Sequence, residues 1–122
     1  MKQRSGQKIF LTIHTMKRGE IWWVSFDPSL HSEIKKTRPA IIISIDLFND
    51  VSRRVQVVPL SSNTQKLYPS ESYVLIGKQK SKAMVDQIAT VDKSRLQKKL
   101  SDASKEDLST LERILKRHLG IS

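Results

Sequence analysis

Short apolar runs separated by polar turns fill most of the chain and predict a series of β-strands. Ile21–Phe26 is β-branched and aromatic, and it ends at Asp27-Pro28 because proline cannot continue a strand ladder. Pro39–Ser44 is a continuous apolar run, which is typical of a strand buried on both faces. Val55–Leu60 alternates and then meets the turn cluster Ser61-Ser62-Asn63.

Two more strands are predicted at Ser72–Ile76 and at about Ala83–Ile88, and a short strand or turn follows at Thr90-Val91. Asp46–Val51 has the pattern of a short helical turn with Asp46 as its N-cap. A second helical turn is predicted over Ser94–Leu100, because this segment contains two leucines at helical spacing. The polar stretch Ser29–Arg38 is too long for a tight hairpin and predicts a surface loop.

The C-terminal part of the chain changes from the period of strands to the period of a helix. Ser104 and Asp107 form a capping-box pattern, basic residues lie in the last turn, and Gly120 closes the helix. The apolar face consists of Leu108, Leu111, Ile114, Leu115 and Leu119.

Several short strands followed by one long helix predict a mainly β fold with α (α+β): a small β-barrel with short helices and a C-terminal amphipathic helix. We assign this domain to residues 16–122. Residues 1–15 are polar and basic, and we expect a flexible N-terminal extension or residues that precede a native start at Met16. The alternating stretch Ile9–Ile13 within them fits an edge strand.

The balance of charge changes this picture from a generic domain to one with a polyanionic partner. The 122 residues contain 22 Lys and Arg against 12 Asp and Glu, which gives a formal net charge of +10. Neutralising phosphates releases condensed counterions, so nucleic acid is the first expected partner and an acidic protein the second. Three of the surplus charges lie in residues 1–15, so most of them belong to the domain.

Composition also excludes several classes of chemistry. The chain has no cysteine, which excludes disulfides and thiolate chemistry and suits a reducing cytoplasm. Its longest apolar run, Pro39–Ile43, is far shorter than the roughly 20 residues of a membrane span, so we expect a cytoplasmic protein without membrane contact. No histidine spacing suits a metal, and no glycine-rich phosphate loop occurs, so no metal or other cofactor is predicted.

Two segments remain that fit phosphate chemistry. Arg38 stands before Pro39 at the end of the polar loop, and its planar guanidinium matches two phosphate oxygens. Ser61 follows a strand and offers a hydroxyl that both donates and accepts. Taken alone, each has a plainer interpretation: a solvated loop arginine, and a turn serine bonded to its own backbone.

The order of the motifs MKRGEIWWVSFDP, KKTRPAIIIS, VVPLSS, AMVDQIATVDKSRL and ERILKRHLG resembles the MazF/PemK (Kid) family of toxin endoribonucleases over residues 16–122. The resemblance implies an SH3-like barrel that forms a homodimer. It further implies metal-independent, sequence-specific cleavage of single-stranded RNA by 2′-OH attack, leaving a 2′,3′-cyclic phosphate and a 5′-OH. An acidic antitoxin protein would neutralise this activity by lying across the RNA groove.

Site residues follow from the same resemblance. The arginine of T-R-P is the family's main catalytic residue and falls on Arg38, while the hydroxyl after V-V-P-L, usually threonine, falls on Ser61. Serine lacks the methyl group that restricts χ1, so looser positioning is expected. The expected RNA-binding residues are Glu33, Lys36, Thr37, Ser62, Asp86 and Gln87.

The loop differs from the family's G-S-E-Q, because His31 stands in place of the glycine and Ile34 in place of a polar residue. Loss of the glycine removes easy access to positive φ, and Ile34 cannot read a base edge, so altered cleavage specificity is expected. His31 is either a proton shuttle or an exposed loop histidine. Asp86 also fits a buried structural carboxylate.

Aromatic and lysine side chains have two interpretations. Trp22 and Trp23 face opposite sides of their strand, so we expect one in the core and the other at a dimer interface, or stacked on a base. Tyr68 and Tyr73 fit the barrel rim better than a base platform. Lys78, Lys80 and Lys82 either follow phosphates or form a solvated face.

The alternative interpretation of the function is a non-catalytic protein on the same barrel. A gyrase-directed toxin, or a regulator that only binds RNA or DNA, would show the same charge and the same strands. Cleavage of RNA distinguishes the two interpretations, because neither alternative cuts RNA.

Overall fold

The computed structural model of the chain describes residues 16–26 and 37–122. Seven strands, two α-helices and two 3-10 turns follow one another in this part of the chain. The strands are β1 (Glu20–Ser25), β2 (Thr37–Ile42), β3 (Arg54–Ser61), β4 (Glu71–Ile76), β5 (Gln79–Met84), β6 (Ala89–Asp92) and β7 (Leu96–Asp102). The helical elements are α2 (Asp46–Val51), η1 (Val85–Gln87), η2 (Lys93–Arg95) and α3 (Lys105–Leu119).

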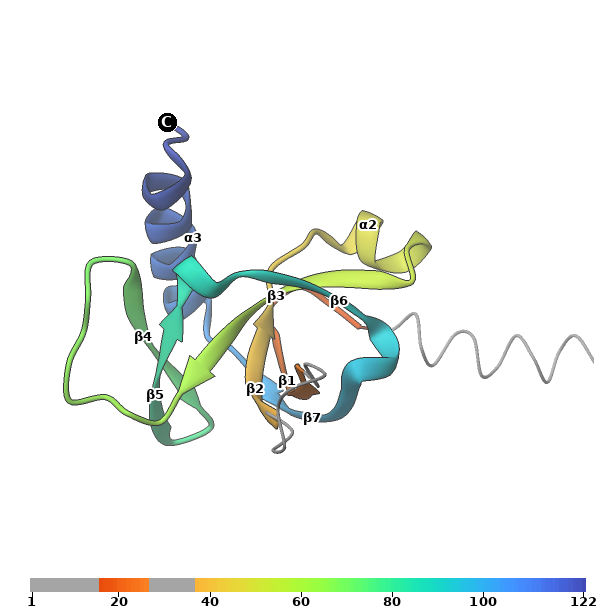
Figure 1. Ribbon diagram of the computed structural model, residues 1–122, viewed down its shortest axis with the longest axis horizontal. Helices are drawn as coiled ribbons and strands as arrows, with labels where there is room; N and C mark the ends of the chain where they lie inside the picture. The colour runs from red at the N-terminus through yellow and green to blue at the C-terminus, as the bar shows by residue number, and fades with distance from the viewer. Residues whose placement is uncertain (1–15, 27–36) are drawn as a thin grey trace, which may run out of the picture.

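All described strand pairs are antiparallel and form one strongly curled sheet in the order β4-β5-β3-β2-β1-β7, with β6 paired to β3 (Figure 1). The sheet bends so far that β4 and β7, at the two ends of this order, contact each other. The curled half-barrel and its C-terminal helix confirm the predicted mainly β barrel fold.

Two apolar clusters fill the two faces of the sheet. One contains Ile21, Ile41 and Leu60 together with Leu111 of α3, all at most 1% exposed. The other contains Val24, Ile42 and neighbouring residues of β3. Successive residues of a strand alternate between these clusters, which is why β2 reads as a continuous apolar run.

Helix α3 is held at both ends as its sequence predicts. The Ser104 hydroxyl accepts from the Asp107 amide (3.0 Å), and Gly120 adopts the left-handed conformation with φ +72°. The Asp107 carboxylate also accepts from the Leu75 amide of β4 (3.0 Å), so the helix start is joined to the sheet. Gly19, with φ +92°, packs its backbone under Leu108, where a larger residue would be strained.

Several predicted bounds were wrong. Of the predicted helical turn Ser94–Leu100, only Ser94 and Arg95 are helical, as the end of η2; the rest belongs to β7, which pairs with β1. A four-residue spacing of leucines also fits one face of a strand, and the hydrogen bonds to β1 select the strand. Asp46 is not an N-cap but the first residue of α2, and its carboxylate accepts from the Arg18 amide (2.7 Å).

The predicted strand Ala83–Ile88 was also placed too late. Residues 79–84 form β5, and the chain turns into η1 at Val85. Strands β4 and β5 form a hairpin whose register joins Ile76 to Gln79 around Gly77 and Lys78. Gly77 has φ +61°, the conformation that type II′ hairpins require at the first loop position, so the Gly-Lys pair is the signal that marks this hairpin.

A buried polar network fastens α2 to the sheet. Asn49, fully buried, accepts from the Ser44 hydroxyl (2.5 Å) and donates to the Ser44 carbonyl (2.8 Å). The Lys93 ammonium donates to the Asn49 carbonyl, and burial lowers the pKa of Lys93 while the charge of Asp50 acts in the opposite direction. These internal hydrogen bonds hold α2 in one position although its own Leu47 and Val51 and the preceding Ile45 are exposed.

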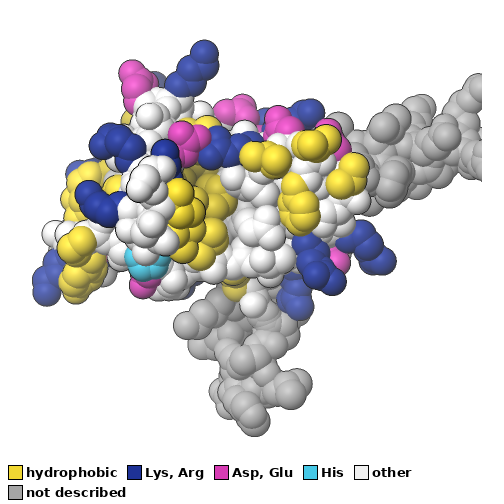
Figure 2. All heavy atoms as spheres, turned by 90° about the horizontal axis from the view of Figure 1, so that it is seen from above, with side chains coloured by type: hydrophobic (Ala, Val, Ile, Leu, Met, Phe, Trp, Pro, Cys, Tyr) yellow, Lys and Arg dark blue, Asp and Glu magenta, His cyan; other side chains and the backbone are white. Residues whose placement is uncertain are grey.

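The face seen from above carries Lys and Arg side chains at both ends, and hydrophobic side chains gather over the α2 end and at the opposite end (Figure 2). No helix in the described part of the chain is long and apolar enough to cross a membrane. The predicted extension over residues 1–15, with its edge strand at Ile9–Ile13, lies outside the described residues.

We predict that Asn49→Ala lowers the free energy of unfolding by about 2–3 kcal/mol, because it removes a fully buried side chain and leaves the half-buried hydroxyl and carbonyl of Ser44 without their partner. Urea denaturation measures the change. The matched control Leu47→Ala alters a side chain of the same helix that is 74% exposed and should shift stability by less than about 0.5 kcal/mol. Equal effects of the two substitutions would contradict the anchoring role of Asn49.

Candidate active site

A cavity of about 420 Å³ opens where the pairing of β2 with β3 ends. Val57, Val58 and Pro59 pair with β2 on one edge of β3, whereas Leu60 and Ser61 pair only with β5, on the other edge. The first residues of β2 pair with β1 alone, which leaves a gap between β2 and the end of β3. Residues of all five strands from β1 to β5 line this opening.

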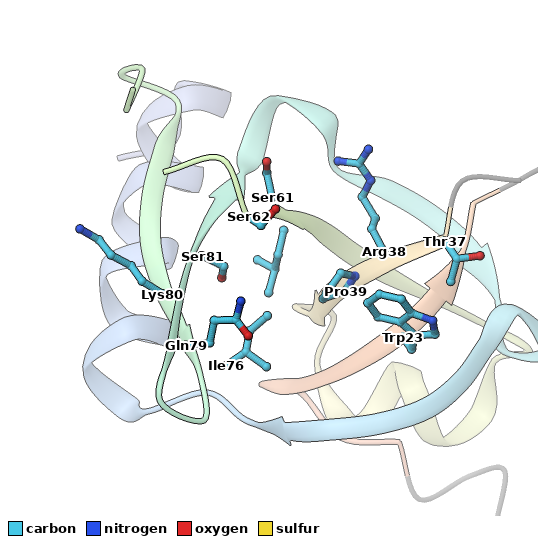
Figure 3. A pocket seen from close by; sticks show the side chains of 11 residues that line it. Trp23, Thr37, Arg38, Pro39, Ser61, Ser62, Ile76, Gln79, Lys80 and Ser81 are labelled. Carbon is cyan, nitrogen blue, oxygen red and sulfur yellow. The ribbon is translucent and has the colours of Figure 1, made fainter. Parts of the chain in front are cut away.

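The register of the sheet sets Arg38 opposite Ser61. Ala40 pairs with Pro59 in β2 and β3, and Arg38 and Ser61 stand two residues beyond this last pair, one on each side of the gap, where both line the cavity. In Figure 3, Arg38 rises from β2 on one side of the cavity, and Ser61 and Ser62 stand on the other. The T-R-P motif of β2 and the V-V-P-L-S motif of β3, which lie far apart in the sequence, thus border the same cavity because β2 pairs with β3.

Arg38 belongs to strand β2 and not to the predicted surface loop, so its backbone is fixed by pairing with Val24. Its side chain is half-buried in the cavity wall. No acidic side chain of the described residues pairs with the guanidinium, and no acidic residue contributes to the cavity lining. The guanidinium therefore keeps its donors for an anion.

Ser61 is likewise the last residue of a strand, where the sequence predicted a turn. Its hydroxyl oxygen accepts from the Asn63 amide (3.1 Å), which is the local backbone bond that the plainer interpretation expected. Because this bond uses only a lone pair, the hydroxyl hydrogen remains available to donate into the cavity. Ser62 and Thr37 add two further hydroxyls to the lining.

The remaining wall is a mixture of apolar and polar groups. Trp23, 38% exposed, and Pro39 lie below Arg38, while Ile76, Gln79 and Ser81 come from the β4–β5 hairpin (Figure 3). Lys80 lines the rim but points away from the cavity, and its ammonium lies 3.9 Å from the centre of the Tyr73 ring.

The two adjacent tryptophans face opposite sides, as their positions in one strand predicted. Trp22 packs on the second apolar cluster, and its indole N–H donates to Glu20 (2.9 Å). Glu20 is buried and also pairs with Lys99 (3.3 Å). These contacts hold β1 in place, so that Trp23 presents its ring to the cavity.

The other expected site residues are not all brought together. Asp86 and Gln87 lie in η1, at the end of β5 away from the cavity, and both are exposed; the Gln87 amide donates to the Met84 sulfur (3.6 Å). Asp86 is thus not a buried structural carboxylate. Glu33 and Lys36, together with His31 and Ile34, lie outside the described residues.

Sequence reasoning missed the wall that β5 contributes. Gln79 and Ser81 were not expected at the site, because the strand was placed four residues too late. Lys82, expected on a solvated or phosphate-binding face, is buried in an ion pair with Glu71. Gly77 is the sequence signal for the hairpin turn, and reading it so would have placed Gln79, Ser81 and Lys82 on β5.

No group of three or more histidine, aspartate or glutamate side chains is placed to hold a metal ion in residues 16–26 and 37–122. The cavity itself offers a guanidinium, four hydroxyls and an aromatic ring. These groups bind an anionic phosphate and stack on a flat ring. Fold and site together define a small basic β-barrel whose opening has the chemistry to receive a phosphate.

Comparison with known proteins assigns this barrel to a family. Residues 17–119 match the model of the PemK-like, MazF-like toxins of type II toxin–antitoxin systems. The chain is 36% identical over 115 residues to endoribonuclease MazF9 of Mycobacterium tuberculosis, which covers 87% of this chain and 98% of the relative. The chain therefore belongs to the PemK/MazF toxin family, which confirms the resemblance found in the sequence.

Solved structures agree with this assignment. The MazF crystal structure (form I) from Deinococcus radiodurans is similar with a TM-score of 0.73 and 26% identity, covering 87% of this chain and 97% of that one. A MazE–MazF crystal structure (form III) from the same organism gives a TM-score of 0.75 and 26% identity, covering 88% of this chain and 98% of that one.

Proposed function

We propose that the chain is the toxin of a type II toxin–antitoxin pair and acts as an endoribonuclease. The family match and the relatives named endoribonuclease support the activity. The observation that carries the chemistry is the opposition of Arg38 and Ser61 across a cavity without an acidic side chain among its described lining. The alternative, a barrel that binds nucleic acid without cutting it, does not require this pairing.

The reaction that this site supports is attack of the RNA 2′-oxygen on the adjacent phosphorus. The 2′-oxygen–phosphorus bond forms as the bond from phosphorus to the 5′-oxygen breaks. The 2′-OH loses its proton, and the leaving 5′-oxygen gains one. The products are a 2′,3′-cyclic phosphate and a 5′-OH, and the step requires no metal.

Arg38 stabilises the charge that builds up on the pentavalent phosphate and assists proton transfer. Its two guanidinium edges donate to phosphate oxygens, and this interaction strengthens as charge develops. Ser61 donates its free hydroxyl hydrogen to a phosphate oxygen or to the leaving oxygen, since its lone pair already accepts from Asn63. Trp23 offers a surface on which a neighbouring base can stack.

The remaining expected residues bind and align the strand. Thr37 and Ser62 line the cavity beside the two catalytic groups. For Glu33, Lys36, Asp86 and Gln87 the proposal rests on the family resemblance, and the exposure of Asp86 and Gln87 leaves them accessible to RNA beyond the cavity. Replacement of the loop glycine and glutamine by His31 and Ile34 is expected to change the recognised sequence.

The proposal extends to partners and location. The family pairs each toxin with an antitoxin, and a MazE–MazF structure is among the similar folds. An acidic antitoxin segment and single-stranded RNA suit the same basic surface, given the net charge of +10. We further propose that the toxin acts as a homodimer in the cytoplasm, where it meets RNA.

We predict that Arg38→Ala lowers kcat for cleavage of single-stranded RNA by about 10²–10³-fold, because a preorganised charged donor to the transition state is lost. Ser61→Ala should lower it by about 10- to 100-fold, the loss of one hydrogen bond to a charged group. Cleavage is measured with excess chelator, and the products are tested for cyclic phosphate ends.

Two controls separate chemistry from folding. Ser61→Thr keeps the hydroxyl and should cut at least as fast as the wild type, since the added methyl restricts χ1. Leu47→Ala, on exposed α2, should leave cleavage unchanged. Full activity of Arg38→Ala would remove the arginine from the mechanism, and strict dependence on Mg²⁺ would contradict the reaction.

We also predict that deleting residues 1–15 weakens the salt dependence of RNA binding but leaves cleavage intact. Three cations are removed, so the slope of log K against log salt should fall in magnitude by up to about 2. Titration of an uncleavable 2′-deoxy oligonucleotide at several salt concentrations measures the slope. An unchanged slope would show that these cations do not contact the strand.

A further inference from the structure

The outer side of the β4–β5 hairpin holds a buried ion pair next to the cavity. Lys82 Nζ lies 3.0 Å from Glu71 Oε1, and the two side chains are 7% and 8% exposed. Desolvating two charges offsets most of their attraction, so such a pair adds little to stability. Its geometry, in contrast, is tightly defined because each charged group has further hydrogen-bond partners.

Strand register places Lys82 beside the proposed catalytic serine. Ser61 pairs directly with Lys82 in β3 and β5, and Lys82 pairs with Tyr73 in β4. Directly opposite residues of antiparallel strands project to the same face. Ser61 and Lys82 thus occupy neighbouring positions of one row of the sheet, and Arg38 stands across the gap from Ser61.

The same pair fastens the segment 62–70, which follows Ser61 and lies beside the hairpin (Figure 1). Lys82 Nζ donates to the Lys66 carbonyl (2.9 Å), and Glu71 accepts from the Tyr68 amide (2.9 Å). A third hydrogen bond, from the Tyr73 hydroxyl of β4 to the Thr64 carbonyl (3.3 Å), holds the part of the segment that is closest in sequence to Ser61. The backbone after Ser62 is therefore attached to β4 and β5 at three points.

We propose that Lys82, held by Glu71, is a positioning residue for RNA cleavage. It fixes segment 62–70 and so keeps the hydroxyls of Ser61 and Ser62 opposite Arg38. This inference rests on the proposed function. Its physical basis is the steep dependence of rate on alignment: a misplacement of about 1 Å costs about 10²-fold.

Glu71 has a second effect on the site. It neutralises an ammonium group that lies one strand away from Ser61. Without the carboxylate, the Lys82 ammonium would be left buried and unpaired, and it would move toward solvent or toward the phosphate. Loss of either partner should therefore disturb the same segment.

The test compares Lys82→Met with Lys78→Met, which removes the same charge from the exposed hairpin turn. Lys82→Met should lower kcat about 10- to 100-fold and change KM less than about threefold. Lys78→Met should keep the wild-type kcat. Lys82→Arg, which retains a buried cation and donors, should recover most of the rate.

A second pair of measurements separates positioning from folding. The double variant Lys82→Met with Glu71→Leu replaces the ion pair by apolar groups and should melt at or above the wild-type temperature, yet cut slowly. In both variants with Lys82→Met, hydrogen exchange at the Tyr68 amide and its neighbours should become faster, while α3 stays protected.

Wild-type kcat in Lys82→Met or in the double variant would overturn the positioning role, as would equal losses in Lys82→Met and Lys78→Met. A wild-type protein that cuts no RNA would overturn the proposed function itself. Hydrogen exchange would then still test the anchoring of segment 62–70. Unchanged exchange at the Tyr68 amide in the variants with Lys82→Met would overturn the anchoring, and faster exchange would support it.

Discussion

The end of pairing between β2 and β3 is the constraint on which the site depends. Strand β3 lies between β2 and β5, and its pairing with β2 stops at Pro59 while Leu60 and Ser61 still pair with β5 on the other edge, so a gap opens on the β2 side. The gap exposes side chains that a continuous sheet would have packed together. Curling of the sheet and the two apolar clusters, one of which includes Leu111 of α3, fix the strands on either side of this gap.

The protein positions the strands around this gap with few buried charges, although its net charge is strongly positive. The described buried ion pairs and polar networks, such as Lys82–Glu71 and Asn49–Ser44, lie around the cavity and under α2, where they fix backbone positions. The cavity keeps an unpaired guanidinium among its described lining, and the surplus of positive charge stays on the surface. The same charge suits both proposed ligands, RNA and an acidic antitoxin.

Sequence analysis predicted the barrel and helix α3 and singled out Arg38 and Ser61, which both line the cavity, because apolar periodicity, the Ser104 cap and the T-R-P and V-V-P-L-S motifs are local signals. It failed where a local pattern fits two structures. Leucines four apart fit helix and strand alike, and only pairing with β1 selects β7. The polar start of β5 gives no apolar signal, so neither its cavity residues nor the buried Lys82 could be recognised before Gly77 is read as a hairpin turn.

The central claim is that Arg38 and Ser61 act together on one phosphate across the gap in the sheet. A double-mutant cycle on kcat tests it most directly, using Arg38→Ala, Ser61→Ala and the double variant. Groups that act as a unit are non-additive, so the double variant should be no more than about threefold slower than Arg38→Ala alone. A double variant whose loss equals the product of the two single losses would show that the residues act independently and would contradict the account.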